Sequence, residues 1–429
     1  MAVFSIATVV AATGIGLLGG VFRWLLEQAE TQRAALMVWA HGSGVGWLVP
    51  VALVAGCATI GHLFTRLAPR ASGSGIQDVE AVWHEQEELP GTAVLPSRFL
   101  GGLAAIGSGM VMGREGPSVH LGSTIGAEVG RWFRLSDYER KLLYTTVGGA
   151  GLAVAFNAPV GGALFTIEEV TKSFRVRVML VTLMSTSVAV WVSRFIIPDR
   201  PDFAVGPVAS PGVGALPVYV VLGLVAGVAG VVYNALVMQL LRRTDRMRLN
   251  ATGRAAIIGG LIGLLLWVEP LAAGGGSQIA QTILSGQGLA LWTLLGLFAV
   301  RFLAGPLSYA SGTPGGLFAP LLALGALLGA AFHALVLAMG GAAAAELLGQ
   351  SPVPFALVGM VALFTASVRA PMTGIVLITE MTATASLTLA MFAAAAAALF
   401  MTTALKGRPI YDSLRDRMLQ LRGVPSRAV

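Results

Sequence analysis

Residues 107–127 read GSGMVMGREGPSVHLGSTIGA, and Arg114 and Glu115 carry the only formal charges in this stretch. Glycine precedes the arginine, and Gly-Pro follows the glutamate. Glycine lets the backbone approach a ligand closely, and proline suits the first turn of a helix, where its missing N–H has no helical partner. The stretch therefore predicts a helix that starts here, with a carboxylate at its N-terminal end.

The composition of the whole chain places this helix in a membrane. Of its 429 residues 55% are hydrophobic and only 11% are charged, whereas a soluble domain carries about 25% charged residues. Apolar windows of about 20 residues, the length that crosses a bilayer as a helix, recur roughly ten or more times. The first of them, VFSIATVVAATGIGLLGGVF, could instead be a signal peptide, but no basic residue precedes it. We predict an all-α polytopic membrane protein.

The charges and the reactive side chains narrow the function further. The net charge of +7 is concentrated in the arginine-rich segments 242–254 and 406–424. This follows the positive-inside rule and indicates cytoplasmic segments rather than a nucleic-acid partner. The single cysteine, Cys57, excludes an intrachain disulfide. No metal site and no cofactor is expected, because the histidines do not have metal-ligand spacing; they are His41, His62, His84, His120 and His333.

Two blocks of the sequence are repeated in the same order. GREGPSVHLGSTIGA (113–127) aligns with GLFAPLLALGALLGA (316–330), and APVGGALFTIE (158–168) aligns with APMTGIVLITE (370–380). In the second block Glu168 corresponds to Glu380. The chain is thus predicted to consist of two homologous halves, 1–206 and 207–429. Many transporters are built in this way, with the substrate at mid-membrane where helices break.

Three segments share a pattern of glycines ahead of an apolar helix: GSGIQ (73–77), GREGP (113–117) and GTPGGLFAP (312–320). Exposed N–H groups and the positive end of the helix dipole form an anion site at such positions. The alternative is that the glycines only let helices pack closely. The recurrence of the pattern, with a carboxylate inside one segment, favours the anion site.

The same segments, together with GLAVAFNAPVGGALFTIEE (151–169) and GRPIYDSL (407–414), resemble the signature segments of the CLC family of chloride channels and chloride/proton antiporters. The resemblance runs from about residue 70 to 415. It implies two inverted halves with broken helices meeting at a mid-membrane anion site, in a homodimer with one pore per subunit. Gln77 replaces the usual proline, Leu317 is a conservative variant, and no C-terminal regulatory domain is expected.

The resemblance also implies roles for individual residues. Glu115 corresponds to the external gating glutamate, which competes with chloride when ionised and swings out when protonated. Ser74 and Tyr411 correspond to the hydroxyl donors of the central chloride site, which is completed by the backbone N–H groups of Leu317 and Phe318. Without the resemblance, Ser74 is interpreted as a helix cap and Tyr411 as an interfacial aromatic residue. The motif residues that support these groups are Gly73, Gly75, Gly113, Arg114, Gly116, Pro117, Gly316 and Pro320.

Other charged residues receive an interpretation as well. Glu169 corresponds to the internal proton-transfer glutamate of many antiporters of the family. The sequence by itself indicates that Glu168 and Glu169 are interfacial carboxylates paired to Lys172 at helical spacing. Arg114 is expected to be structural and to pair with Glu80 or Asp78, because an unpaired charge inside a membrane is expensive. Glu380 has no expected role beyond a buried or interfacial pairing.

These observations predict a bacterial-type chloride/proton antiporter in the inner membrane, with its basic C-terminal tail in the cytoplasm. Its partners are chloride, protons, membrane lipid and a second copy of the chain, and it is not an enzyme. A passive CLC channel, or a member selective for nitrate or fluoride, is the alternative, although Ser74, Tyr411 and GREGP argue against the fluoride branch. A cation transporter, or an intramembrane serine hydrolase with His120 as base, is a more distant possibility.

Overall fold

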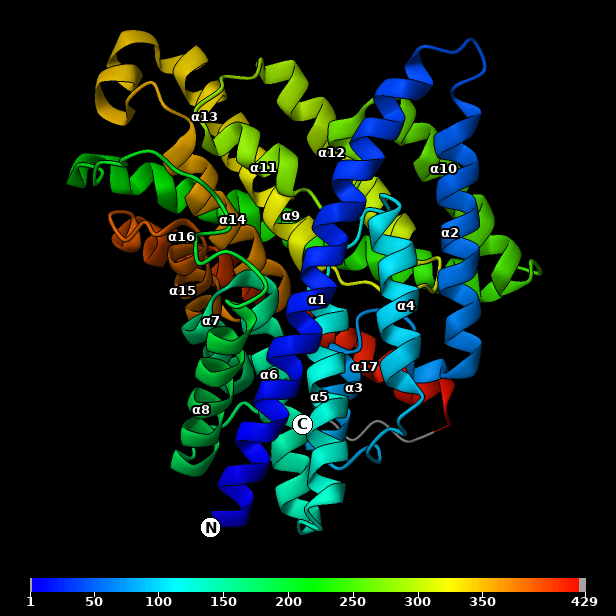
Figure 1. The fold of residues 1–429 in the computed structure, drawn as a ribbon. Coiled ribbons are helices and arrows are strands. Elements are labelled where there is room, and N and C mark those ends of the chain that lie inside the picture. Colours follow the sequence, from blue (N-terminus) through cyan, green and yellow to red (C-terminus); the bar gives the residue numbers. More distant parts are fainter. Residues whose placement is uncertain (1, 424–429) are drawn as a thin grey trace.

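A computed structural model describes residues 2–423 (Figure 1). Within this range the regular structure consists of α-helices, joined by short 3-10 and π turns. The helices up to residue 193 are α1 (Ala2–His41), α2 (Leu48–Leu67), α3 (Ile76–Trp83), α4 (Val94–Gly107), α5 (Glu115–Trp132), α6 (Asp137–Phe156), α7 (Pro159–Phe165) and α8 (Val176–Ser193). The helices after it are α9 (Leu216–Arg246), α10 (Ala251–Val268), α11 (Ser277–Leu284), α12 (Leu291–Tyr309), α13 (Phe318–Leu348), α14 (Val353–Val368), α15 (Pro371–Thr382), α16 (Thr388–Ala404) and α17 (Ile410–Leu421).

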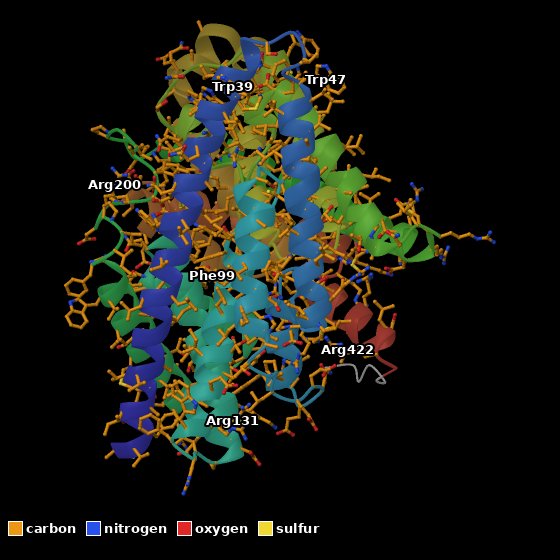
Figure 2. All side chains as sticks on the ribbon, turned by 45° about the vertical axis from the view of Figure 1, so that its right-hand side comes forward. Trp39, Trp47, Phe99, Arg131, Arg200 and Arg422 are labelled. Carbon is orange, nitrogen blue, oxygen red and sulfur yellow. The ribbon has the colours of Figure 1, made fainter. Side chains whose placement is uncertain are left out.

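The long apolar helices confirm an integral membrane protein. Among the described residues, seven helices are long and apolar enough to cross a membrane, and α4, α14 and α16 are shorter apolar helices. The first apolar window forms part of α1, which packs against α8. Trp39 and Trp47 lie at one end of the molecule, and Arg131 and Arg422 lie at the other (Figure 2).

The centre of the fold consists of two tight helix pairs, α5 with α6 and α13 with α14. A Cβ atom on Gly122 of α5 would lie 2.2 Å from the carbonyl oxygen of Val147 on α6. A Cβ atom on Gly325 of α13 would lie 2.5 Å from the carbonyl oxygen of Gly359 on α14. Gly122 and Gly325 correspond in the repeated sequence block, and each allows its helix pair to pack closely.

The helices α3 and α11 begin from matching glycine turns. Gly75 precedes α3 with a φ of +86°, and Gly276 precedes α11 with a φ of +101°. A fully buried arginine stabilises each turn by donating to its carbonyl groups. Arg98 donates to Gly73 and Arg70, and Arg301 donates to Leu271, Ala273 and Gly274. The roles of the two arginines were not predicted, although the similar segments PRASGSG (69–75) and PLAAGGG (270–276) indicate matching turns.

The two glutamates that correspond in the repeat cap each other's helices. The carboxylate of Glu168 accepts from the backbone N–H groups of Met372 (3.1 Å) and Thr373 (2.7 Å), at the start of α15. The carboxylate of Glu380 accepts from Val160 (3.1 Å) and Gly161 (2.7 Å), at the start of α7. A carboxylate is favourable there because it satisfies free N–H groups at the positive end of the helix dipole. Glu380 therefore has a specific structural role, and Glu168 does not pair with Lys172.

Replacing Glu380 with alanine is expected to lower the thermal stability of the purified protein. The variant loses a cap and a favourable charge–dipole interaction, which together contribute about 1–2 kcal/mol. Thermal unfolding in detergent measures the effect, with Glu346→Ala as the control because Glu346 is exposed at the end of α13. Equal melting temperatures for the two variants would show that the capping geometry contributes little stability.

Candidate anion and proton site

Three glycine-rich loops meet in the interior and are joined by backbone hydrogen bonds. Gly73 donates to Thr313 (3.2 Å), and Gly315 donates to Gly73 (3.1 Å). Gly113 and Gly316 exchange two N–H···O bonds of 2.8 Å each. The starts of α3, α5 and α13 are thereby fixed relative to one another, which is what an anion site built from helix N-termini requires.

Ser74 lies in the first of these loops and is completely buried. Its backbone N–H donates to the hydroxyl of Tyr309 at 3.1 Å, while its own hydroxyl has no hydrogen-bond partner among the described residues. A Cβ atom on Gly116 would lie 2.6 Å from the Ser74 hydroxyl oxygen, so only glycine fits beside it. Since α3 begins at Ile76, Gln77 in place of proline does not alter the start of the helix.

Tyr411 lies in the first turn of α17, which packs against α3. Its side chain is fully buried, and its hydroxyl likewise has no protein partner in the described part of the chain. The structure therefore does not support an interfacial position for Tyr411. Seven buried hydroxyl groups lack a partner among the described residues, and those of Ser74 and Tyr411 are the two that the sequence predicted as donors to a small anion.

Leu317 and Phe318 form the start of α13, so their backbone N–H groups belong to the unpaired first turn. The Phe318 ring packs among Phe156, Phe165 and Phe364, with centroid separations of 5.2, 6.1 and 4.4 Å. This aromatic cluster fixes the position of the helix start. The N–H groups can therefore be directed at a ligand without adding a buried positive charge.

Glu115 is the first residue of α5, and only 1% of it is exposed. Its Oε2 accepts from the backbone N–H of Ala319, in the first turn of α13, at 3.4 Å. A Cβ atom on Gly113 would lie 1.9 Å from the same oxygen, so the folded-back carboxylate requires glycine there. The carboxylate thus lies at the N-terminal ends of two helices, in a position that suits any anion.

The prediction that Arg114 pairs with Glu80 or Asp78 is wrong. Its guanidinium pairs with Asp202 (3.2 Å) and Glu27 (3.5 Å). Asp78 pairs instead with Arg70 and accepts from Tyr144, and Glu80 pairs with Arg415. The physical reason is that Arg114 lines the cavity beside α1, whereas both α3 carboxylates are satisfied by side chains from other elements.

The prediction that Glu169 forms an ion pair with Lys172 is also wrong. Lys172 pairs with Asp412 at 3.0 Å, and Glu169 is buried, with 3% of its surface exposed. Glu169 lies in a π turn, Thr166–Val170, after which Lys172 adopts a φ of +45°. Helical i, i+3 spacing therefore does not hold between the two residues. Glu169 Oε1 has no hydrogen-bond partner among the described residues, which suits a group that exchanges protons.

The arrangement around His120 does not favour a serine hydrolase. His120 Nδ1 lies 2.9 Å from a guanidinium nitrogen of Arg98, and Nε2 lies 3.2 Å from the carboxylate of Asp78. Both ring nitrogens face charged groups behind the glycine turn. A base for Ser74 needs a ring nitrogen within hydrogen-bond reach of its hydroxyl, and no such contact occurs between these described residues.

Helix N-termini that meet at interior glycine loops, with a carboxylate and the unpartnered Ser74 hydroxyl beside them, are typical of the class of small-anion transporters and channels. The family model described as voltage gated chloride channel matches residues 56–403. The chain belongs to this CLC family of chloride channels and transporters.

Relatives and solved structures agree with this assignment. The H(+)/Cl(-) exchange transporters ClcA of Salmonella typhi and Salmonella typhimurium are each 37% identical to the chain, over 98% of its length and 89% of theirs. A slow cyanobacterial Cl-/H+ antiporter has the same fold, with a TM-score of 0.92 and 28% identity over 98% of this chain and 99% of the other. A CLC-type fluoride/proton antiporter shares the fold at 22% identity, with a TM-score of 0.78 over 96% and 97% of the chains.

Proposed function

We propose that the protein exchanges chloride for protons across the membrane, with Glu115 serving both ions. The observation that carries the proposal is the Glu115 carboxylate, which accepts a backbone N–H at the start of α13. A site that holds a carboxylate there also holds chloride, so the two compete. Protonation removes the charge of the side chain and frees the position for an anion, which couples proton uptake to chloride movement.

Chloride is proposed to bind between the hydroxyls of Ser74 and Tyr411 and the backbone N–H groups of Leu317 and Phe318. The two orphaned hydroxyls support this assignment. Hydroxyl and N–H donors hold the ion without a full positive charge, so it can leave again. Glu169 is proposed to pass protons to the other side of the membrane. The exchange activity in the names of the relatives favours an antiporter over a passive channel.

The family resemblance also supports a homodimer in the bacterial inner membrane, with one pore per subunit, the halves 1–206 and 207–429, and a cytoplasmic tail. The tail residues up to 423 carry arginines that pair with the rest of the protein, including Arg415 with Glu80 and Arg417 with Asp245. Residues 424–429 lie outside the described residues.

The proposed exchange is tested by reconstitution into liposomes that carry a chloride gradient and a proton-sensitive dye. Chloride moving down its gradient is expected to drive protons against theirs. Dissipation of the chloride gradient without proton movement would instead support the passive channel. Replacing chloride by fluoride or nitrate in the same assay identifies the preferred anion.

Replacing Ser74 with proline is expected to shift the preference from chloride toward nitrate by about five- to tenfold, or about 1–1.4 kcal/mol. The substitution removes one of two side-chain donors and also the N–H that bonds to Tyr309. A site built on a specific donor discriminates through it, so its loss favours a larger, weakly hydrated anion. The ratio of nitrate to chloride flux measures the shift.

Tyr309→Phe is the control for this experiment, because it removes the partner of the Ser74 backbone but leaves the Ser74 hydroxyl. It is expected to keep the flux ratio of the wild type. The structure contradicts a helix-cap role for Ser74, because the cap position of α3 is Gly75 and the Ser74 hydroxyl accepts no N–H. A Ser74→Pro protein with an unchanged flux ratio and a lower melting temperature would mean that the Ser74 hydroxyl does not select the anion.

A further inference from the structure

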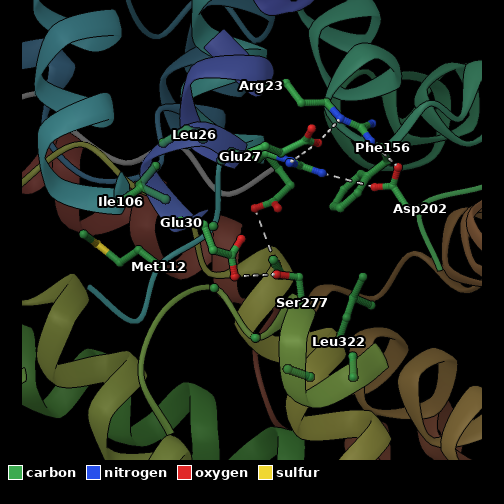
Figure 3. Close-up of a pocket in the computed structure, with 18 of the residues that line it drawn as sticks. Arg23, Leu26, Glu27, Glu30, Ile106, Met112, Phe156, Asp202, Ser277 and Leu322 are labelled. Carbon is green, nitrogen blue, oxygen red and sulfur yellow. Dashed lines mark hydrogen bonds and ion pairs between the residues drawn. The ribbon is translucent and has the colours of Figure 1, made fainter. Parts of the chain in front are cut away.

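A cavity of about 240 Å³ is lined on one side by Arg114 and Glu115. Figure 3 shows its other lining residues, among them Arg23, Glu27 and Asp202. Its wall on the α1 side carries Arg23, Glu27, Glu30 and Arg33. Asp202, from the segment that connects α8 to α9, lines it as well. The cavity, called the vestibule below, therefore adjoins the Glu115 side of the proposed anion site.

Four of these side chains form a closed ring of alternating charges, the vestibule ring: Arg23, Asp202, Arg114 and Glu27. Arg23 lies 2.7 Å from Asp202 and 2.9 Å from Glu27. Arg114 lies 3.2 Å from Asp202 and 3.5 Å from Glu27. The charges of the two arginines and the two carboxylates cancel, so the ring is neutral although its arginines line the vestibule.

Asp202 is the buried carboxylate of the vestibule ring. Only 7% of its side chain is exposed, compared with 40% for Glu27. It neutralises both arginines at once, one through each oxygen. Because Asp202 is shielded from water, its charge acts on the vestibule with less screening than the charge of Glu27.

The position of Asp202 is set by contacts with the later part of the chain. The N–H of Phe203 donates to Met381 at the end of α15 (3.0 Å). Ala204 and the side chain of Gln281 in α11 exchange two hydrogen bonds of 2.9 Å. The connecting segment thus holds a carboxylate between α1 and the loop that carries Glu115.

We propose that Asp202 is a positioning residue of the vestibule, which holds Arg114 and Arg23 in neutral pairs and thereby limits the affinity of the Glu115 side for external anions. The proposal rests on the proposed chloride transport. An anion that approaches Glu115 meets arginines whose charges are already balanced. Weak attraction at this point lets chloride leave as readily as it arrives, as rapid turnover requires.

Asp202→Asn is the direct test, because asparagine keeps the shape of the side chain and leaves the ring with one excess positive charge. The apparent Km for chloride on the Glu115 side is expected to fall about fivefold, with kcat unchanged or slightly lower. The Km on the opposite side is expected to stay the same. Radioactive chloride uptake into right-side-out spheroplasts and inverted vesicles, at constant ionic strength, separates the two sides.

Asp199→Asn is the matched control, since Asp199 lies in the same connecting segment and pairs with Arg194, with 63% of its side chain exposed. Its Km values are expected to equal those of the wild type. The double variant Arg23→Gln/Asp202→Asn restores neutrality and is expected to return the Km to the wild-type value. If Asp202→Asn does not fold, Glu27→Gln removes the other carboxylate and is expected to lower the same Km.

The outcomes distinguish this proposal from the proposed function. A wild-type protein that moves no chloride contradicts the function itself. A functional wild type, with Asp202→Asn lowering only kcat or protein yield, contradicts the proposed role of Asp202 and leaves transport intact. The proposed role of Asp202 is also contradicted if the Km for chloride changes equally on both sides of the membrane. A low Km that persists in the neutral double variant would contradict it as well.

Discussion

Glu115→Gln is expected to conduct chloride without moving protons. The carboxamide has the size of the carboxylic acid but cannot release or take up a proton at this site. It also carries no charge, so it competes poorly with chloride for the helix N-termini at α5 and α13. Proton flux driven by a chloride gradient is expected to fall about a hundredfold or more, while chloride flux persists and loses its dependence on pH.

The measurement uses liposomes in which chloride and proton fluxes are recorded together. Glu128→Gln is the control, because Glu128 lies on the same helix but pairs with Arg131 near its other end, at 3.1 Å. That variant is expected to keep the coupling of the wild type. Chloride-driven proton pumping that survives in Glu115→Gln would remove Glu115 from the mechanism.

The sequence predicted the parts of the site that depend on local signals. Glycines, proline and a hydroxyl or carboxylate before an apolar run define a helix start, so the starts of α3, α5 and α13 could be located without a structure. GREGP also specifies the position of Glu115 in the first turn of α5. These features need only neighbouring residues, because the dipole and the free N–H groups belong to the helix end itself.

The errors concern partners that are distant in the sequence. Arg114 pairs with Asp202 and Glu27, 88 and 87 positions away, and no local pattern predicts such contacts. The pairing of Lys172 failed for a different reason, because a π turn breaks the helical spacing on which the expectation depended. Arg114 and Lys172 are each paired as expected, but with other carboxylates, because the tertiary fold determines which groups meet.

The sequence contains a weak signal for the two buried arginines that stabilise the glycine turns. Arg98 and Arg301 stabilise equivalent turns, and their positions match the offset of the first repeated block. Alone, an arginine in an apolar segment indicates only that a partner must exist. The shared pattern around Gly73 and Gly274 would have supplied that partner, since a tight turn exposes several carbonyl groups at one point.

Glu169→Gln is expected to stop proton transport while chloride flux continues. Glu169 lies in the π turn Thr166–Val170 that follows α7, and its Oε1 has no hydrogen-bond partner among the described residues. The chain reaches a partly exposed region three residues later, where 38% of the Lys172 side chain is exposed. A carboxyl group at such a boundary can exchange protons with water at modest cost, and glutamine cannot.

Its neighbour Glu168 supplies the matched control, because Glu168→Gln makes the same change one residue away. Glu168 caps α15, so this variant is expected to lose stability by about 1 kcal/mol while it still couples the two ions. Proton flux in Glu169→Gln is expected to fall about a hundredfold, with chloride flux within a factor of a few of the wild type. An equal loss of both fluxes in Glu169→Gln would show that the residue supports the packing around Glu80 and Asp412, and that protons take another route.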